Sequence, residues 1–300
     1  MEKNLYIDAS HPDETRIVLK SDNGIEEYEY EDKNKLNFKN NIYLGTVSRV
    51  EPSLQAAFVD FGRIKHGFLA FNDIQSDYYQ IPTEDKERLK EIEEKIREDL
   101  KNTNLDVSNN ELKSENENIN SEDENVNKKD NKETQIQEEE KQDINVREKL
   151  KNSYGVKRYK IQEVIKPGQV ILIQVIKEER GNKGAALTTF ISLAGKYMVL
   201  MPNTAKGGGI SRKIFLSSER TKIRKILSEI EIPKSMGVIV RTAGSNKTKN
   251  EIEKDFQNTL KTWDLIRNKA LDSNAPSLIY EEGDVIKRAL RDIYDNETTN

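Results

Sequence analysis

The stretch NIYLGTVSRVEPSLQAAFVDFGRIKHGFLAFNDI, residues 41–74, carries the densest fold signal in this chain. It contains two strand-like runs, residues 42–50 and 56–61, separated by a Glu-Pro-Ser turn and followed by Gly62 and Gly67. Short strands with glycine at the bends are typical of small OB-type barrels, which bind single-stranded nucleic acid on exposed aromatic and basic side chains. The stretch therefore predicts half of such a barrel.

Two phenylalanines of this stretch, Phe58 and Phe68, are candidates for stacking on bases. Basic residues that could follow the phosphates flank them in the sequence, at Arg63, Lys65 and His66. The alternative is that both rings belong to the barrel core, which is the more common place for a phenylalanine in a barrel strand. Phe68 follows a glycine at a bend and is the better candidate for an exposed ring. The residues alone leave both interpretations open.

The second half of the barrel is expected later in the chain. Residues 170–177 (VILIQVIK) and 183–192 predict two further strands, joined by a charged turn that contains glycine. Lys177 and Lys183 flank this turn, so a phosphate could use both ammonium groups. The alternative is that each lysine is simply solvated, as most lysines in turns are.

The segment between the two halves is highly charged. Residues 76–150 carry 23 of the 53 acidic residues but only 13 of the 49 basic ones, which leaves a mildly basic remainder of 36 against 30. A mildly basic surface suits a phosphate-bearing partner. Apolar spacing predicts a charged helix at residues 82–102. Residues 103–146 cannot bury enough apolar surface to offset chain entropy, so we expect them to be disordered.

The 300 residues are enough for more than one buried core. Alternation predicts strands within residues 4–18, 25–30, 197–201 and 238–241, and helical spacing predicts helices at residues 219–230, 251–271 and 284–294. The chain has no cysteine, which excludes thiolate zinc sites and a cysteine nucleophile. No stretch approaches the roughly 20 apolar residues of a membrane span, so we expect a soluble, cytoplasmic protein.

Several longer strings resemble the RNase E/G family of bacterial endoribonucleases. They are VEPSLQAAFVDFG at residues 50–62, EERGNKGAALTTFISLAG at 178–195, LMPN at 200–203, GGISRK at 208–213 and VIVRTAG at 238–244. The resemblance covers nearly the whole chain outside the insert and implies an α+β fold with the insert inside the barrel. The implied parts are an RNase H-like domain (residues 1–38 and 215–300), an OB-fold barrel (39–75 and 159–190), a charged helix with the disordered acidic insert (76–158) and a 5′-sensor subdomain (191–214, with 238–244 contributing to its pocket).

The resemblance also implies which residues touch RNA. On the barrel these are Phe58, Phe68 and Lys183, with Lys177 as a weaker addition, and stacking then outweighs the core interpretation. The partner implied is single-stranded RNA with a 5′-monophosphate end. In the end-sensing pocket, the pair Arg241-Thr242 would hold that phosphate with a guanidinium fork and a hydroxyl. The other positions that match the family's pocket are Gly195, Val199 and Arg212. Lys213 stands where some relatives carry a second arginine, so a fork-like contact is not expected there.

The activity that the resemblance implies is endoribonucleolytic cleavage of single-stranded RNA in rRNA processing and mRNA decay. The family's catalytic aspartates hold Mg²⁺. They and the two-cysteine Zn²⁺ link between subunits of a possible homo-oligomer would lie beyond residue 300. The string Asp143-Ile144-Asn145 echoes the aspartate motif by chance, and Asp292 at a helix end is expected to be solvated. We therefore expect no catalytic residue, metal ligand, cofactor or membrane segment in these residues. The alternatives are a non-catalytic RNA-binding protein and a truncated gene remnant.

Overall fold

The computed structural model of the chain describes residues 3–32, 37–88, 91–92, 159–178, 184–204, 208–233, 235–294 and 298. Two compact units are present. Met1–Gln80, Lys160–Thr204 and Gly208–Asn300 form the first, and Ile81–Tyr159 with Ala205–Gly207 form the second. In the second unit, residues 83–88 and 91–92 are helical, which confirms that part of the predicted charged helix. The predicted disorder at residues 103–146 and the candidate Lys183 lie outside the described residues.

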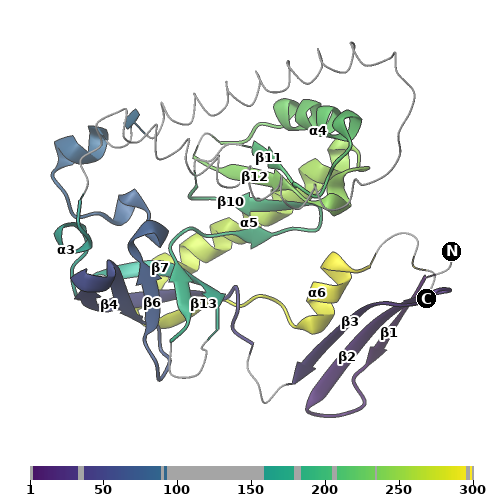
Figure 1. Cartoon of the computed structure of the whole chain (residues 1–300), viewed down its shortest axis with the longest axis horizontal. Coiled ribbons are helices and arrows are strands. Elements are labelled where there is room, and N and C mark those ends of the chain that lie inside the picture. The colour runs from purple at the N-terminus through teal and green to yellow at the C-terminus, as the bar shows by residue number, and fades with distance from the viewer. Residues whose placement is uncertain are drawn as a thin grey trace, which may run out of the picture. The chain divides into compact units, whose positions relative to one another are not determined.

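Five strands of the first unit close into a β-barrel, consistent with the predicted OB fold (Figure 1). The pairing runs β4-β5-β6-β8-β7 and returns to β4. The strands are β4 (Ile42–Glu51), β5 (Ala56–Asp60), β6 (Gly67–Ala70), β7 (Val170–Lys177) and β8 (Ala186–Thr188). A bulge between Val47 and Arg49 allows β4 to pair with β7 through its first half and with β5 through its second. The barrel thus joins the two halves that the charged segment separates in the sequence.

Alternating residues of these strands fill the barrel. Ala57, Val59 and Leu69 are fully buried, and so are Ile171 and Ile173 on β7. A Cβ at position 67 would overlap the side chain of Leu187, so glycine is required where β6 passes β8. A short helix, α3 (Ile161–Val164), precedes β7. β13 (Ser277–Tyr280), which was not predicted, pairs antiparallel with β4.

A second sheet has the order β11-β12-β10-β9. Its strands are β9 (Leu193–Ala194), β10 (Met198–Met201), β11 (Gly208–Ile210) and β12 (Gly237–Val240). Two helices pack on it, α4 (Ser217–Glu229) against β11 and α5 (Lys249–Asp272) against β9 and β10. The sheet therefore places β10 and β11 beside β12, the strand that precedes Arg241.

The long helix α5 has a well-defined start. Thr248 accepts a hydrogen bond from the backbone N–H of Glu251, and the Glu251 carboxylate accepts one from the backbone N–H of Thr248 at 2.9 Å. This reciprocal capping box satisfies two backbone donors that the helix leaves open and lowers the pKa of Glu251. The apolar face of α5 buries Ile252, Phe256 and Ile266 against the second sheet.

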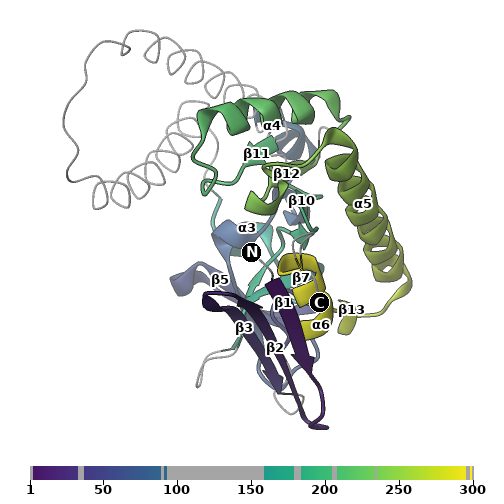
Figure 2. The same cartoon turned by 90° about the vertical axis from the view of Figure 1, so that its right-hand side faces the viewer.

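The remaining strands form an antiparallel meander, β1 (Lys3–Asp8), β2 (Glu14–Ser21) and β3 (Gly24–Asp32). Helix α6 (Val285–Asp292) packs on β2 and β3 through Val285 and Ala289 (Figure 2). The predicted strands and helices of the first unit are thus confirmed. The RNase H-like domain was expected to combine residues 1–38 with residues 215–300. In the structure the described part of the meander packs on α6, whereas α4 and α5 pack on the second sheet. The RNase H-like assignment therefore stays a prediction. No helix among the described residues is long and apolar enough to cross a bilayer.

Candidate nucleic-acid interface

The two candidate phenylalanines lie on the outside of the barrel. Phe58 on β5 and Phe68 on β6 are direct register partners, and both are half-buried. Their sequence neighbours Ala57, Val59 and Leu69 point inward and are fully buried. The two rings meet edge to face with 6.0 Å between their centroids. Neither ring is among the buried residues of the core, and both are partly accessible to solvent.

A row of register partners extends this aromatic pair across the barrel surface. Arg49 on β4 pairs with Phe58, and its guanidinium carbon lies 4.3 Å from the ring centroid. On the other side, Phe68 pairs with Ala186, which pairs in turn with Lys177. Arg49 and Lys177 are both exposed. We call these five residues the barrel row: a cation at each end, two rings and a small methyl side chain between them.

Sequence reasoning identified most of this row but missed Arg49. The bulge between Val47 and Arg49 breaks the alternation of β4, so the face of Arg49 could not be read from the pattern. Of the basic residues that flank the rings in sequence, Arg63 lies over Phe38, 4.4 Å from the ring centroid, and His66 is exposed.

The second candidate site lies at the end of β12. Arg241 follows this strand, and its backbone N–H donates to the carbonyl of Tyr197 at 2.8 Å. Its Nη1 donates to the carbonyl of Gly195 at 2.8 Å and to Oδ1 of Asp292 at 2.5 Å. Within the described part of the chain, Nε and Nη2 of Arg241 make no hydrogen bond. One nitrogen of the guanidinium is thus anchored by two acceptors, while these other two nitrogens are not.

Three other predicted pocket residues gather at the same end of the sheet. Thr242 opens the short helix η4 (Thr242–Gly244) and is exposed. Arg212 is also exposed, in a turn that begins at Ser211, whose N–H donates to the carbonyl of Val240 at 2.8 Å. Gly195 contacts Arg241 directly, as described above. Val199 lies further along β10, half-buried and opposite Ile239. The structure therefore brings Gly195, Arg212, Arg241 and Thr242 together, with Val199 one step removed.

Asp255 on α5 fixes the backbone that carries Gly195. Its carboxylate accepts hydrogen bonds from three consecutive backbone N–H groups, those of Lys196 (3.1 Å), Tyr197 (2.9 Å) and Met198 (3.2 Å). A Cβ at position 195 would come within 2.5 Å of the Asp255 carboxylate, so this turn accepts only glycine without a shift. No local motif could identify Asp255, because its partners lie nearly sixty residues earlier in the sequence.

The expectation that Asp292 is solvated is wrong. Besides Arg241, its carboxylate binds Nε and Nη2 of Arg291 at 3.1 and 2.8 Å. Arg291 also pairs with Glu282 at 2.8 Å. Burial alone would raise the pKa of Asp292, but the hydrogen bonds from Arg291 and Arg241 outweigh burial and lower it. Asp292 is thus a charged anchor for the guanidinium of Arg241.

Across the described ranges, no group of three or more His, Asp or Glu side chains is arranged to hold a metal ion.

Comparison with known proteins connects these features to one family. Residues 192–300 match the model of the ribonuclease E/G family. The chain is 34% identical over 290 residues to ribonuclease E of Escherichia coli (strain K12), a match that covers 97% of this chain and 21% of that protein. It is 31% identical to the putative ribonuclease E of Buchnera aphidicola subsp. Baizongia pistaciae, covering 97% and 53%. Ribonuclease E of Synechocystis is 42% identical over 137 residues, which are 46% of this chain and 20% of that protein.

The chain therefore spans about a fifth of the length of the Escherichia coli relative and about half that of the Buchnera relative. The similarity nevertheless runs through both candidate sites, since it extends over 97% of the chain. Together with the family-model match, it identifies the chain as a ribonuclease E/G-like protein.

Proposed function

We propose that this chain binds single-stranded RNA on the barrel row and recognises a 5′-monophosphate at Arg241 and Thr242. It would be the RNA-recognition portion of a ribonuclease E/G-type endoribonuclease that acts in rRNA processing and mRNA decay in the cytoplasm. Single-stranded RNA with a 5′-monophosphate end is the partner, and the complete enzyme would be a homo-oligomer. The observation that carries the proposal is the half-buried pair of register partners on the outside of the barrel, Phe58 and Phe68, between two cations.

The chemistry of the barrel row suits single-stranded RNA. Bases can stack on half-buried rings whatever their identity, because every base has a π-face. Arg49 and Lys177 lie at the two ends of the row, where they can neutralise phosphates on either side of the stacked bases. Lys183 would add a third cation. A row of this composition favours binding with little sequence preference.

The pocket at Arg241 suits a terminal phosphate. The anchors at Gly195 and Asp292 hold one nitrogen of the guanidinium, so Nε and Nη2 are left to bind two phosphate oxygens. The exposed Thr242 hydroxyl can donate to a third oxygen. Arg291 shares the Asp292 carboxylate, which limits the repulsion that this carboxylate exerts on an incoming phosphate. Gly195, Val199 and Arg212 would complete the walls of the pocket.

Neither metal that the resemblance implies fits the residues that the structure describes. Without cysteine they cannot form the thiolate Zn²⁺ link, and the described carboxylates form no cluster that could hold Mg²⁺. The role that these residues support is therefore the binding and positioning of RNA.

The barrel half of the proposal is tested by truncating the rings. Phe58→Ala and Phe68→Ala should each weaken binding of a single-stranded oligonucleotide by about 1–3 kcal/mol, measured by fluorescence anisotropy. Phe71→Ala is the matched control, because Phe71 is also half-buried but stacks on Tyr79, outside the row. If both row variants bound RNA as tightly as the control while remaining folded, the barrel row would not be the RNA-binding surface.

A further inference from the structure

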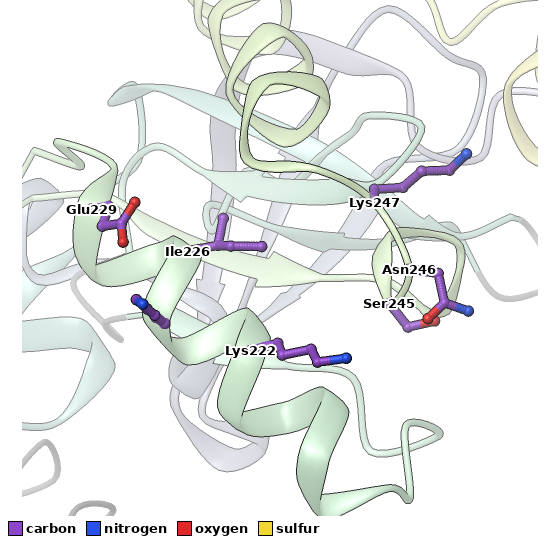
Figure 3. A pocket seen from close by; sticks show the side chains of 7 residues that line it. Lys222, Ile226, Glu229, Ser245, Asn246 and Lys247 are labelled. Atoms are coloured by element: carbon purple, nitrogen blue, oxygen red, sulfur yellow. The ribbon is translucent and has the colours of Figure 1, made fainter.

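A cavity of about 410 Å³ lies between α4 and the loop that follows η4 (Figure 3). One wall carries Lys222, Lys225 and Ile226 from α4, and the facing loop supplies Ser245, Asn246 and Lys247. None of these residues belongs to the barrel row or to the pocket at Arg241. The cavity is thus a separate hollow in the same compact unit, with three ammonium groups, the carboxylate of Glu229, an amide and a hydroxyl around it.

The spacing of α4 explains why the lysines share one wall. Lys222 lies three residues before Lys225 and four before Ile226, and Glu229 lies four residues after Lys225, which places all four on one face of a helix. The neighbouring face buries Ile223 against Ile214 and Val240 and holds α4 on the second sheet. The lysine-bearing face is therefore fixed toward the loop and is exposed.

Ion pairs and a helix cap fix the opposite wall. Lys249, the first residue of α5, forms an ion pair with Glu229 of α4 at 3.2 Å. This ion pair connects the end of the loop to α4. This contact also neutralises the one carboxylate in the wall. Lys247 lies 3.7 Å from Glu251 and 5.3 Å from the centre of the Tyr197 ring. The capping box of Thr248 and Glu251 orders the start of α5 directly behind the loop.

The cavity carries an excess of positive charge. Neither Lys222 nor Lys225 makes an ion pair with any other residue that the structure describes. The start of the 24-residue helix α5 lies directly after the loop and adds partial positive charge from its unpaired backbone N–H groups. Ile226 is the single apolar residue in the lining and is itself half-buried.

We propose that this cavity binds phosphodiester groups of an RNA backbone, independently of sequence and of the 5′ end. Lysine ammonium groups act on phosphates as point charges, and Ser245 and Asn246 can donate hydrogen bonds to phosphate oxygens. Ser245 closes the η4 turn, and its N–H donates to the carbonyl of Thr242 at 3.1 Å. The cavity and the Arg241 pocket thus lie at the two ends of one turn. The choice of RNA as the polyanion rests on the proposed function.

The test uses the full chain and a 5′-hydroxyl oligouridine of about 20 nucleotides, longer than the roughly 4–16 that one OB barrel covers. The double variant K222Q/K225Q should lower the slope of log Kd against log salt by about 1.4, since each single-strand phosphate contact contributes about 0.7. Its Kd should rise at least about tenfold at 0.1 M salt, and the difference should shrink toward 1 M. The matched control is K254Q/K261Q, which removes the same charge from another exposed stretch, the outer face of α5.

Two outcomes would overturn the assignment. An equal loss of RNA affinity in K254Q/K261Q would mean that only the total charge of the protein matters. An unchanged salt slope in K222Q/K225Q would mean that the cavity does not bind RNA phosphates. A 5′-monophosphorylated copy of the same RNA should show the same loss in K222Q/K225Q, which separates this site from the end pocket. If the unmodified chain bound no RNA at all, the proposed function itself would fail. RNA binding by the unmodified chain that K222Q/K225Q did not weaken would remove only this inference.

Discussion

The carboxylate of Asp292 lies 2.5 Å from Nη1 of Arg241, although 51 residues separate them in sequence. Asp292 ends helix α6, whose Val285 and Ala289 pack on the β1–β3 meander. Arg241 follows β12 in the second sheet. One ion pair therefore connects the meander's helix to the pocket proposed for the RNA end.

Replacing Asp292 by asparagine should destabilise the protein by about 1 kcal/mol at pH 7. The contact is charge-assisted, but it is partly exposed and so is discounted for solvent screening. Chemical denaturation measures the change. Asp264→Asn is the control, because it breaks a more exposed pair with Arg267 and should cost less than about 0.5 kcal/mol. Equal costs for the two variants would contradict the role of Asp292 as an anchor.

The same pair predicts a dependence of stability on pH. The folded-state pKa of Asp292 is lowered, so its contribution is fully present above the unfolded value of about 3.9. It is lost as the pH falls through the lowered folded-state pKa. Unfolding free energies measured between pH 5 and pH 2 should therefore converge for the unmodified chain and Asp292→Asn. A gap that stayed constant down to pH 2 would be inconsistent with this assignment.

The turn at Gly195 should tolerate no side chain. Gly195→Ala places a Cβ against the Asp255 carboxylate, which accepts hydrogen bonds from three backbone N–H groups. We therefore expect this variant to lose the preference for a 5′-phosphate and to be destabilised by about 1–3 kcal/mol. Gly209→Ala is the matched control, since its Cβ would meet Ile239 at an ordinary 3.5 Å. Thermal melts and RNA titrations of both variants check this. The expectation fails if Gly195→Ala behaves like the control.

Arg49 should contribute to RNA binding although no motif pointed to it. Arg49→Ala removes a cation from the end of the barrel row and should lower the salt slope of RNA binding by about 0.7. Arg267→Ala, an exposed arginine on α5, controls for the loss of one charge. Binding by the two variants with the same salt slope would show that Arg49 does not contact the RNA.

Much of the fold followed from local patterns. Residues 41–74 and 170–177 contain enough alternation and turn chemistry to predict the barrel strands. The four residues of β13 do not contain enough of such a pattern to predict a strand, because this strand depends on its pairing with β4. Ala57 and Val59, on either side of Phe58, are buried, so Phe58 points outward. Alternation along β5 alone would have allowed this inference.

Side-chain partners were harder to predict than strands. Asp255 and Asp292 act on residues that lie more than fifty positions away, and no spacing rule relates such positions before the chain is folded. Arg49 was hidden for a local reason, the bulge that shifts its face. The RNase H-like assignment and the roles of the pocket residues came from family resemblance and stay predictions.

The most direct test of the account compares two forms of one single-stranded oligonucleotide, with a 5′-monophosphate and with a 5′-hydroxyl end. The unmodified chain should bind the monophosphate form about 10- to 150-fold more tightly, as expected for a charge-assisted contact of about 1.5–3 kcal/mol. Arg241→Lys keeps the positive charge but loses the two-pronged geometry of the guanidinium, and Thr242→Ala removes an exposed hydroxyl. Each variant should reduce the ratio of the two affinities while leaving the affinity for the 5′-hydroxyl RNA unchanged. Equal affinity of the unmodified chain for the two RNA forms would contradict the assignment of Arg241 and Thr242 to the RNA end.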